Sequence, residues 1–259
     1  MTRDTADSTV DAAAATVAAN AGAPKNERIL DIAGLRTTAV GNPDAPLTLV
    51  LLHGYAMEPA DLSPFAHSIG IPAYFLLPQG PVTSPNGGHA WWEVDLEARQ
   101  SALALGPRDL ANDHPSGLAD ARRQFGQFLA ALTAEAKPGH SANRKTVIGG
   151  FSQGGMLALD WVLRGNQRVD GLALLSTSRL AVDEWEPQRE RLHDLPVFLS
   201  HGATDRDLAF AAGERLRDFL LESAAQLTWS PFEGGHEIPF VVWRGLRKFL
   251  TVYAKMKGI

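Results

Sequence analysis

The sequence predicts an α/β protein with a mostly parallel central sheet and helices on both faces. Short, wholly apolar runs alternate with longer segments in which apolar residues recur every three or four positions. Continuous apolar runs are typical of strands buried on both faces, and parallel strands need a connection long enough to hold a helix. No repeat or linker interrupts this alternation, so residues 27–259 are predicted to form a single domain.

The individual elements follow in chain order. Residues 28–41, RILDIAGLRTTAVG, hold two β-like runs around Ala33-Gly34 and predict a leading hairpin. Further strands are expected at residues 47–54, 73–78, 146–150, 172–176, 197–202 and 227–232, the last with the weakest pattern. Apolar stripes predict helices at residues 118–132, 154–164, 208–223 and 242–253.

Two segments lie outside this alternation. Residues 1–26 are rich in Ala, Thr and Asp and lack the apolar core of a secretory signal, so a poorly ordered tail is expected, with a short loose helix as the alternative. Residues 80–114 are rich in Pro, Gly and Asn, and loops of this length are usually functional or disordered. This second segment is a candidate for a loop that closes over a substrate.

Composition excludes several classes of protein. The net charge of -5 argues against a nucleic-acid surface, and no segment approaches the ~20 apolar residues of a membrane span, so stable membrane insertion is not expected. The absence of cysteine rules out disulfides, thiolate metal sites and a cysteine nucleophile, and it is compatible with a cytoplasmic location. Neither phosphate-binding glycine motif is present, which argues against a nucleotide-binding protein. The sequence does not decide the oligomeric state and is compatible with a homodimer.

The segment GGFSQGG, residues 149–155, carries the most specific signal. It contains G-x-S-x-G centred on Ser152, directly after a predicted strand and directly before a predicted helix. This is the setting of a nucleophile elbow in the α/β-hydrolase fold, where a sharp turn exposes the serine hydroxyl. The alternative is a glycine-rich turn with an incidental serine.

A serine nucleophile needs a base and an orienting acid, which follow it in this fold in the order acid, then histidine. Asp205 follows the strand 197–202, and His236 follows the strand 227–232 in the glycine-rich loop EGGHEIP. Asp207 is an alternative acid, and His201 is expected to be structural. The segment HEIPF begins like a zinc-protease motif, but Phe240 stands where the second histidine is required, so no metal site is predicted.

Two backbone N–H groups are candidates for the oxyanion hole: that of Gln153, next to the nucleophile, and that of Tyr55 in LLHGYA. His53 is expected to shape this loop rather than act as a second base. Four apolar side chains are candidates for an acyl pocket, although each could instead belong to the core: Trp91, Trp92, Phe151 and Leu180.

Together these segments resemble the α/β-hydrolase phospholipase/carboxylesterase family, which includes bacterial carboxylesterases and acyl-protein thioesterases. LLHGYA, GGHAWWEVD, GFSQGG, SHGATD and GGHEIP resemble family segments in the same order, and the resemblance covers roughly residues 45–257. The family often has a glycine after the strand 172–176, whereas this chain continues Thr-Ser-Arg-Leu.

The resemblance implies a serine hydrolase that cleaves small-molecule carboxylic esters or thioesters without a cofactor. It implies Ser152, Asp205 and His236 as the triad, with Tyr55 and Gln153 as oxyanion donors. The alternatives are a lysophospholipase, a peptidase-like relative, and a non-catalytic binding protein on the same fold.

Overall fold

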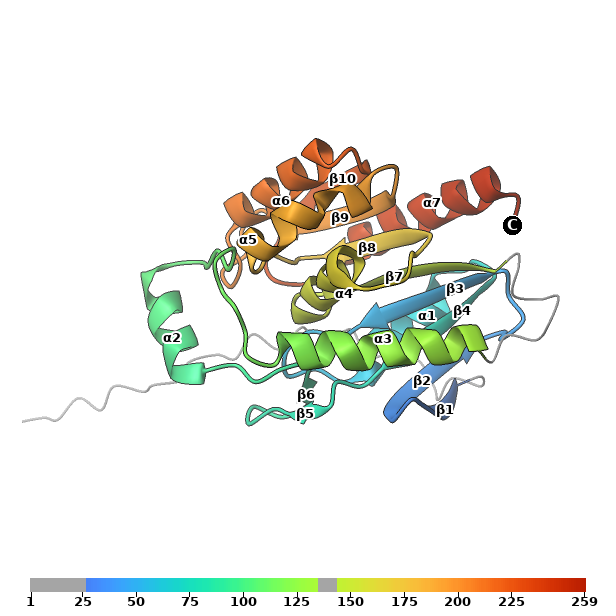
Figure 1. The fold of residues 1–259 in the computed structure, drawn as a ribbon, viewed down its shortest axis with the longest axis horizontal. Coiled ribbons are helices and arrows are strands. Elements are labelled where there is room, and N and C mark those ends of the chain that lie inside the picture. Colours follow the sequence, from blue (N-terminus) through green and yellow to red (C-terminus); the bar gives the residue numbers. More distant parts are fainter. Residues whose placement is uncertain (1–26, 135–143) are drawn as a thin grey trace, which may run out of the picture.

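The computed structural model describes residues 27–134 and 144–259, and the tail expected at residues 1–26 lies outside these ranges (Figure 1). Eight strands form one sheet in the order β1-β2-β4-β3-β7-β8-β9-β10. Their bounds are β1 Glu27–Ile32, β2 Leu35–Gly41, β3 Leu47–Leu52, β4 Ala73–Pro78, β7 Lys145–Phe151, β8 Gly171–Leu175, β9 Pro196–Gly202 and β10 Gln226–Phe232. Every strand expected from the sequence is present, with ends that differ by at most two residues.

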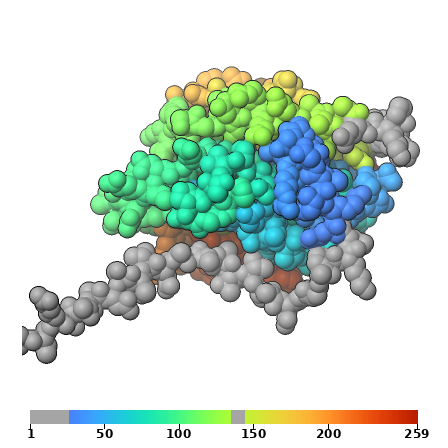
Figure 2. Space-filling model, turned by 90° about the horizontal axis from the view of Figure 1, so that it is seen from below, coloured from blue at the N-terminus to red at the C-terminus, as the bar shows by residue number. Residues whose placement is uncertain are grey.

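The sheet is mostly parallel, as predicted. The six strands from β4 to β10 pair in parallel, whereas β1 pairs with β2, and β2 with β4, in antiparallel fashion. The leading hairpin turns at Ala33 and Gly34, which both have positive φ, as a tight two-residue hairpin turn requires. Figure 2 shows this hairpin, in blue, on the outer surface at the edge of the sheet.

Helices cover both faces, because side chains of the central strands alternate between two cores. In β3, Val50 and Leu52 face one hydrophobic cluster while Leu49 and Leu51 face the other. The first cluster lies under α3 Leu118–Ala134, α4 Gln153–Arg164 and α6 Phe210–Glu222. The second lies under α1 Pro59–Ser68 and α7 Phe240–Lys257.

Several elements were not expected individually. Helix α1 begins at Pro59 and contains Pro64, and such a proline-containing segment gives only a weak helical pattern. The stretch 80–114 holds a short hairpin, β5 Val82–Thr83 and β6 His89–Ala90, and the helix α2 Leu96–Leu105. No residue of α2 is buried, and the helix lies at one side of the molecule, away from the sheet (Figure 1). Its sequence therefore carries no apolar stripe that could have predicted it. Two further short elements between β8 and β9 are the helix α5 Val182–Trp185 and the 3-10 helix Glu186–Leu192.

A buried ion pair joins α3 to α4. The carboxylate of Asp160 is fully buried and accepts from Arg122 at 2.7 Å and from the indole N–H of Trp185 at 2.9 Å. Burying a charge is unfavourable unless it is paired and hydrogen-bonded, so these two donors fix how α3, α4 and α5 pack together.

Candidate active site

The sharp turn between β7 and α4 presents Ser152 at the carboxyl end of the sheet. Ser152 has φ 51° and ψ -116°, a conformation that non-glycine residues rarely adopt. A Cβ at Gly154 would lie 2.5 Å from the carbonyl oxygen of His53 and closer still to that of Leu52, so only glycine lets α4 approach β3. A Cβ at Gly150 would lie 2.5 Å from the backbone of Gly154. The glycines of the motif are therefore required by backbone packing.

Two hydrogen bonds, one to the last residue of β8 and one from the segment that follows it, hold the strained turn. The Ser152 N–H donates to the carbonyl of Leu175 at 2.9 Å, and the hydroxyl of Thr177 donates to the Ser152 carbonyl at 2.9 Å. The next hydroxyl along, that of Ser176, donates to the carbonyl of Glu237 at 3.2 Å. No sequence pattern marks Thr177 and Ser176 for these contacts, because a polar pair at a strand end is ordinary.

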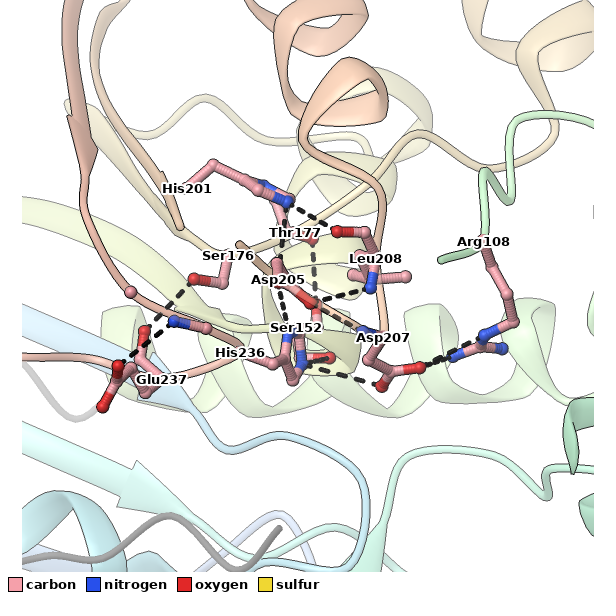
Figure 3. A network of polar contacts seen from close by, with 12 residues as sticks. Arg108, Ser152, Ser176, Thr177, His201, Asp205, Asp207, Leu208, His236 and Glu237 are labelled. Atoms are coloured by element: carbon pink, nitrogen blue, oxygen red, sulfur yellow. Dashed lines mark hydrogen bonds and ion pairs between the residues drawn. The ribbon is translucent and has the colours of Figure 1, made fainter. Parts of the chain in front are cut away.

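The three side chains singled out in the sequence lie within hydrogen-bonding distance (Figure 3). His236 Nε2 is 2.9 Å from Ser152 Oγ, and His236 Nδ1 is 2.7 Å from Asp205 Oδ2. A carboxylate can only accept, so Nδ1 carries the ring proton and Nε2 accepts from the serine hydroxyl. This is the arrangement that a general base needs.

Asp205 is held in a single orientation by its own loop. Its side chain is fully buried, and Oδ1 accepts from the N–H groups of Asp207 at 2.8 Å and Leu208 at 2.9 Å. Oδ2 is thereby left to face His236. His201 lies behind it, with Nε2 3.0 Å from the Leu208 carbonyl and 3.5 Å from Asp205 Oδ2. Burial lowers the pKa of His201, which fits the structural role expected for this residue.

Asp207, the alternative acid, lies on the other side of the imidazole. Its Oδ2 is 3.9 Å from His236 Nε2, not near Nδ1, and its carboxylate pairs with Arg99 at 2.9 Å and Arg108 at 2.5 Å. Burial opposes ionisation of Asp207, but the neighbouring His236, Arg108 and Arg99 outweigh burial and hold its pKa below the ordinary value. Asp205 therefore faces Nδ1 and Asp207 does not, and the role of Asp205 as the orienting acid stays a prediction.

The two proposed oxyanion donors lie at the junction of β3 and α4. Gln153 is the first residue of α4, and Tyr55 lies two residues beyond the carbonyl of His53 that crowds Gly154. Neither backbone N–H has an acceptor within the described residues. N–H groups at a helix start are free to bind an anion.

The Gln153 side chain has a further role that the sequence did not reveal. It accepts from the Trp91 N–H at 2.9 Å and donates to the Trp92 carbonyl at 3.0 Å. This side chain therefore connects the backbone of Trp91 and Trp92 to the turn that holds Ser152, which explains why glutamine rather than an apolar residue follows the serine.

Both ring nitrogens of His53 contact backbone groups, and neither contacts Ser152. His53 is fully buried, with Nδ1 2.7 Å from the Gly54 carbonyl, while Nε2 accepts from the Gly80 N–H at 2.8 Å. Burial lowers the pKa of His53 to about 4, so the ring is neutral and fixed in one tautomer. This geometry fits a loop-shaping residue.

The four candidates for the acyl pocket are all packed in the core. Trp91 is 2% exposed and donates from its indole to the His53 carbonyl at 2.9 Å, and Phe151 stacks obliquely on His236 with ring centroids 4.8 Å apart. Trp92 and Leu180 are 5% and 1% exposed. Their role in binding an acyl chain stays a prediction.

Among residues 27–134 and 144–259, no group of three His, Cys, Asp or Glu side chains is arranged to hold a metal ion. Phe240, which interrupts the zinc-like motif, begins α7 with 77% of its surface exposed. None of the described helices is long and apolar enough to cross a membrane.

A strained strand-to-helix turn with Ser152 at the carboxyl end of a mostly parallel sheet, and Asp205 and His236 in the loops after β9 and β10, is the arrangement of an α/β-hydrolase. Residues 37–254 match the Phospholipase/Carboxylesterase family model, and the chain belongs to this family.

Relatives and solved structures agree with this assignment. The chain is 30% identical over 119 residues to acyl-protein thioesterase 1 of Cryptococcus neoformans, covering 43% of this chain and only 45% of that protein. It is 28% identical over 186 residues to acyl-protein thioesterase 1 of Neurospora crassa, covering 68% and 72% of the two chains. The crystal structure of esterase PE8 superposes with a TM-score of 0.70 at 25% identity, covering 85% of this chain and 99% of that one.

Proposed function

We propose that this protein is a serine hydrolase that cleaves carboxylic esters, and thioesters by the same chemistry, through an acyl-enzyme on Ser152. The observation that carries the proposal is the chain of two hydrogen bonds, 2.9 Å and 2.7 Å long, from Ser152 through His236 to Asp205. Relatives named as acyl-protein thioesterases and a similar structure named as an esterase support the same class of reaction.

The geometry gives each group a role in a two-step acyl transfer. As Ser152 Oγ attacks the carbonyl carbon, His236 Nε2 takes its proton, and the carboxylate of Asp205 stabilises the resulting imidazolium. The N–H groups of Tyr55 and Gln153 donate to the oxyanion that forms. The leaving group takes the proton from His236, which then activates a water molecule to release the acid and restore the serine hydroxyl.

The direct test is Ser152→Ala, assayed with a panel of p-nitrophenyl esters of increasing acyl length beside a thioester. We expect kcat to fall by up to ~10⁶, by analogy with triad knockouts. Ser178→Ala is a matched control, because Ser178 is a buried hydroxyl at the same sheet edge that donates to the Arg179 carbonyl at 3.2 Å.

A fluorophosphonate probe separates the enzyme from a non-catalytic binding protein. The probe should form an adduct at Ser152 in the wild-type chain and none in the alanine variant. A wild-type chain that neither reacts with the probe nor hydrolyses any ester of the panel would contradict the proposal.

A cytoplasmic location and a homodimer complete the proposal. The lack of cysteine suits a reducing compartment.

On α7, Val241, Val252 and Met256 are spaced to lie on one exposed helix face, with 43%, 46% and 62% of their surfaces exposed. Light scattering of the wild type and of Val252→Asp tests the dimer, since a charge on this face should leave only monomers. A wild type that is already monomeric would refute it.

A further inference from the structure

A second charged cluster borders the catalytic histidine and has no place in the triad. It consists of Arg99 from α2, Arg108 from the following loop, and Asp207. Figure 3 shows Asp207 between His236 and Arg108. The Asp207 carboxylate lies 3.9 Å from Nε2, the nitrogen that hands its proton to the leaving group. A single carboxylate therefore separates two guanidinium groups from the reacting atoms.

The cluster has unused hydrogen-bond donors. Arg99 contacts Asp207 only through Nη2, and Arg108 through Nε and Nη2. Their remaining N–H groups have no acceptor in the part of the chain that the structure describes. The side chains of Arg99 and Arg108 are 29% and 16% exposed, so a ligand can reach them from solvent. A guanidinium with free N–H groups matches the geometry of a carboxylate.

The balance of charge around the cluster favours an anion. Two arginines face one ionised aspartate, and no second carboxylate forms an ion pair with either arginine among the described residues. Asp113 is within electrostatic range of Arg108 but forms no ion pair with it among the described residues, and Asp109 is paired with Arg215 at 2.6 Å.

Arg179 adds an independent observation at the same edge of the sheet. It is partly buried, its Nε is shielded from solvent without a partner, and within residues 27–134 and 144–259 it forms no ion pair. It lies two residues after Thr177, whose hydroxyl holds the Ser152 carbonyl. The residues that follow it pair with the loop of Arg108, since the N–H groups of 181 and 182 donate to the carbonyls of 113 and 111. A partly buried cation without a counter-charge is unfavourable unless a ligand supplies one.

We infer that Arg99 and Arg108, supported by Arg179, form an anion subsite that makes the protein prefer esters carrying a carboxylate a few atoms from the scissile carbonyl. The inference rests on the proposed hydrolase function and names the class of substrate for that site. Asp207 orients the two guanidinium groups and keeps them from contacting the imidazole.

The same contacts also hold the polypeptide together, so the test must separate recognition from structure. Arg108 N–H donates to the Asp207 carbonyl at 2.9 Å, and its own carbonyl accepts from Ala209 N–H at 2.9 Å. Arg99 joins α2 to Asp207 by an ion pair, and no residue of that helix is buried. Loss of a purely structural contact would affect all substrates alike.

The experiment compares two p-nitrophenyl esters of similar size, the anionic hemisuccinate and the neutral butyrate, on the wild type, Arg99→Gln and Arg99→Lys. Arg99→Gln should lower kcat/KM for the hemisuccinate roughly tenfold more than for the butyrate, mainly through KM, which is the size expected for one charge-assisted hydrogen bond. Arg99→Lys should recover part of the difference. Arg123→Gln, which removes an exposed arginine of α3, is the control for a lost surface charge.

Ionic strength gives a second readout on the unmutated protein. Raising the salt concentration from about 0.05 M to about 0.5 M should reduce the preference for the hemisuccinate, because salt screens partly exposed charges. Equal losses for the two esters in Arg99→Gln would show a structural contact and overturn the subsite, as would a wild type that hydrolyses the butyrate with no preference for the hemisuccinate. A wild type that hydrolyses no ester would refute the proposed hydrolase function, and the subsite with it.

Discussion

Replacing Asp205 with asparagine probes the hydrogen bonds on which the catalytic arrangement depends. Oδ1 of Asp205 accepts from two backbone N–H groups, so the amide oxygen of the asparagine must take its place. The amide nitrogen then faces Nδ1 of His236, at the position where Oδ2 is now 2.7 Å away. An amide N–H donates to Nδ1 and forces the ring proton onto Nε2, where it cannot accept the proton of Ser152.

The expected loss of kcat is large because the imidazole of His236 is still present but in the wrong tautomer. We expect kcat to fall by ~10⁴, equivalent to about 5.5 kcal/mol of transition-state stabilisation, as in triads where the same change has been made. The assay is p-nitrophenyl butyrate hydrolysis under saturating conditions, with thermal unfolding as the check that the variant is folded.

Asp207→Asn is the matched control for this prediction. It makes the same chemical change two residues away, on a carboxylate that faces Nε2 from 3.9 Å and not Nδ1. Its effect on butyrate hydrolysis should be at least a hundredfold smaller than that of Asp205→Asn. An Asp205→Asn variant within tenfold of wild type, or two variants of equal severity, would refute the assignment of the orienting acid.

Three further predictions concern stability. Gly154→Ala should lower the free energy of unfolding by about 3 kcal/mol, because its Cβ would overlap backbone carbonyl oxygens, whereas Gly235→Ala, with no atom within 4 Å of the added Cβ, should change it little. Arg122→Ala should destabilise by about 3 kcal/mol because it strands a fully buried carboxylate, whereas Arg123→Ala breaks an ion pair with a 66% exposed arginine and should change unfolding by less than about 1 kcal/mol. The pKa of His53 is about 4 in the folded protein against an ordinary 6.5, so the unfolded chain takes up a proton on this ring before the folded protein does. The free energy of unfolding should therefore be unaffected by His53 above pH 6.5 and fall by about 3 kcal/mol as the pH drops to 4. Denaturant unfolding at a series of pH values measures all three, and a wild-type stability that is flat between pH 6.5 and 4 would contradict the last.

Much of the fold followed from the sequence because its signals are local. The strands β3, β4, β7, β8 and β9 are buried on both faces and lie where continuous apolar runs predicted them. The hairpin β1-β2 and the strand β10 lie where shorter or weaker β-like patterns predicted them. Helices such as α3 and α7 bury one face and carry the matching apolar stripe. Helix α2 was missed for the opposite reason: it buries no residue, so no apolar pattern marks it.

The candidate site divides in the same way. The sequence alone selected Ser152, Asp205 and His236. The glycines around the serine, and the order in which the acid and the base follow two predicted strands, can both be seen in the sequence. Only the tertiary structure decided that Asp205 faces Nδ1 while Asp207, two residues on, faces Nε2 with two arginines beside it. Arg99 and Arg108 lie about a hundred residues from Asp207 in the chain and meet it only when the sheet is assembled. Local patterns determine which residues can do chemistry, whereas the direction in which each side chain points depends on contacts between segments that are distant in sequence.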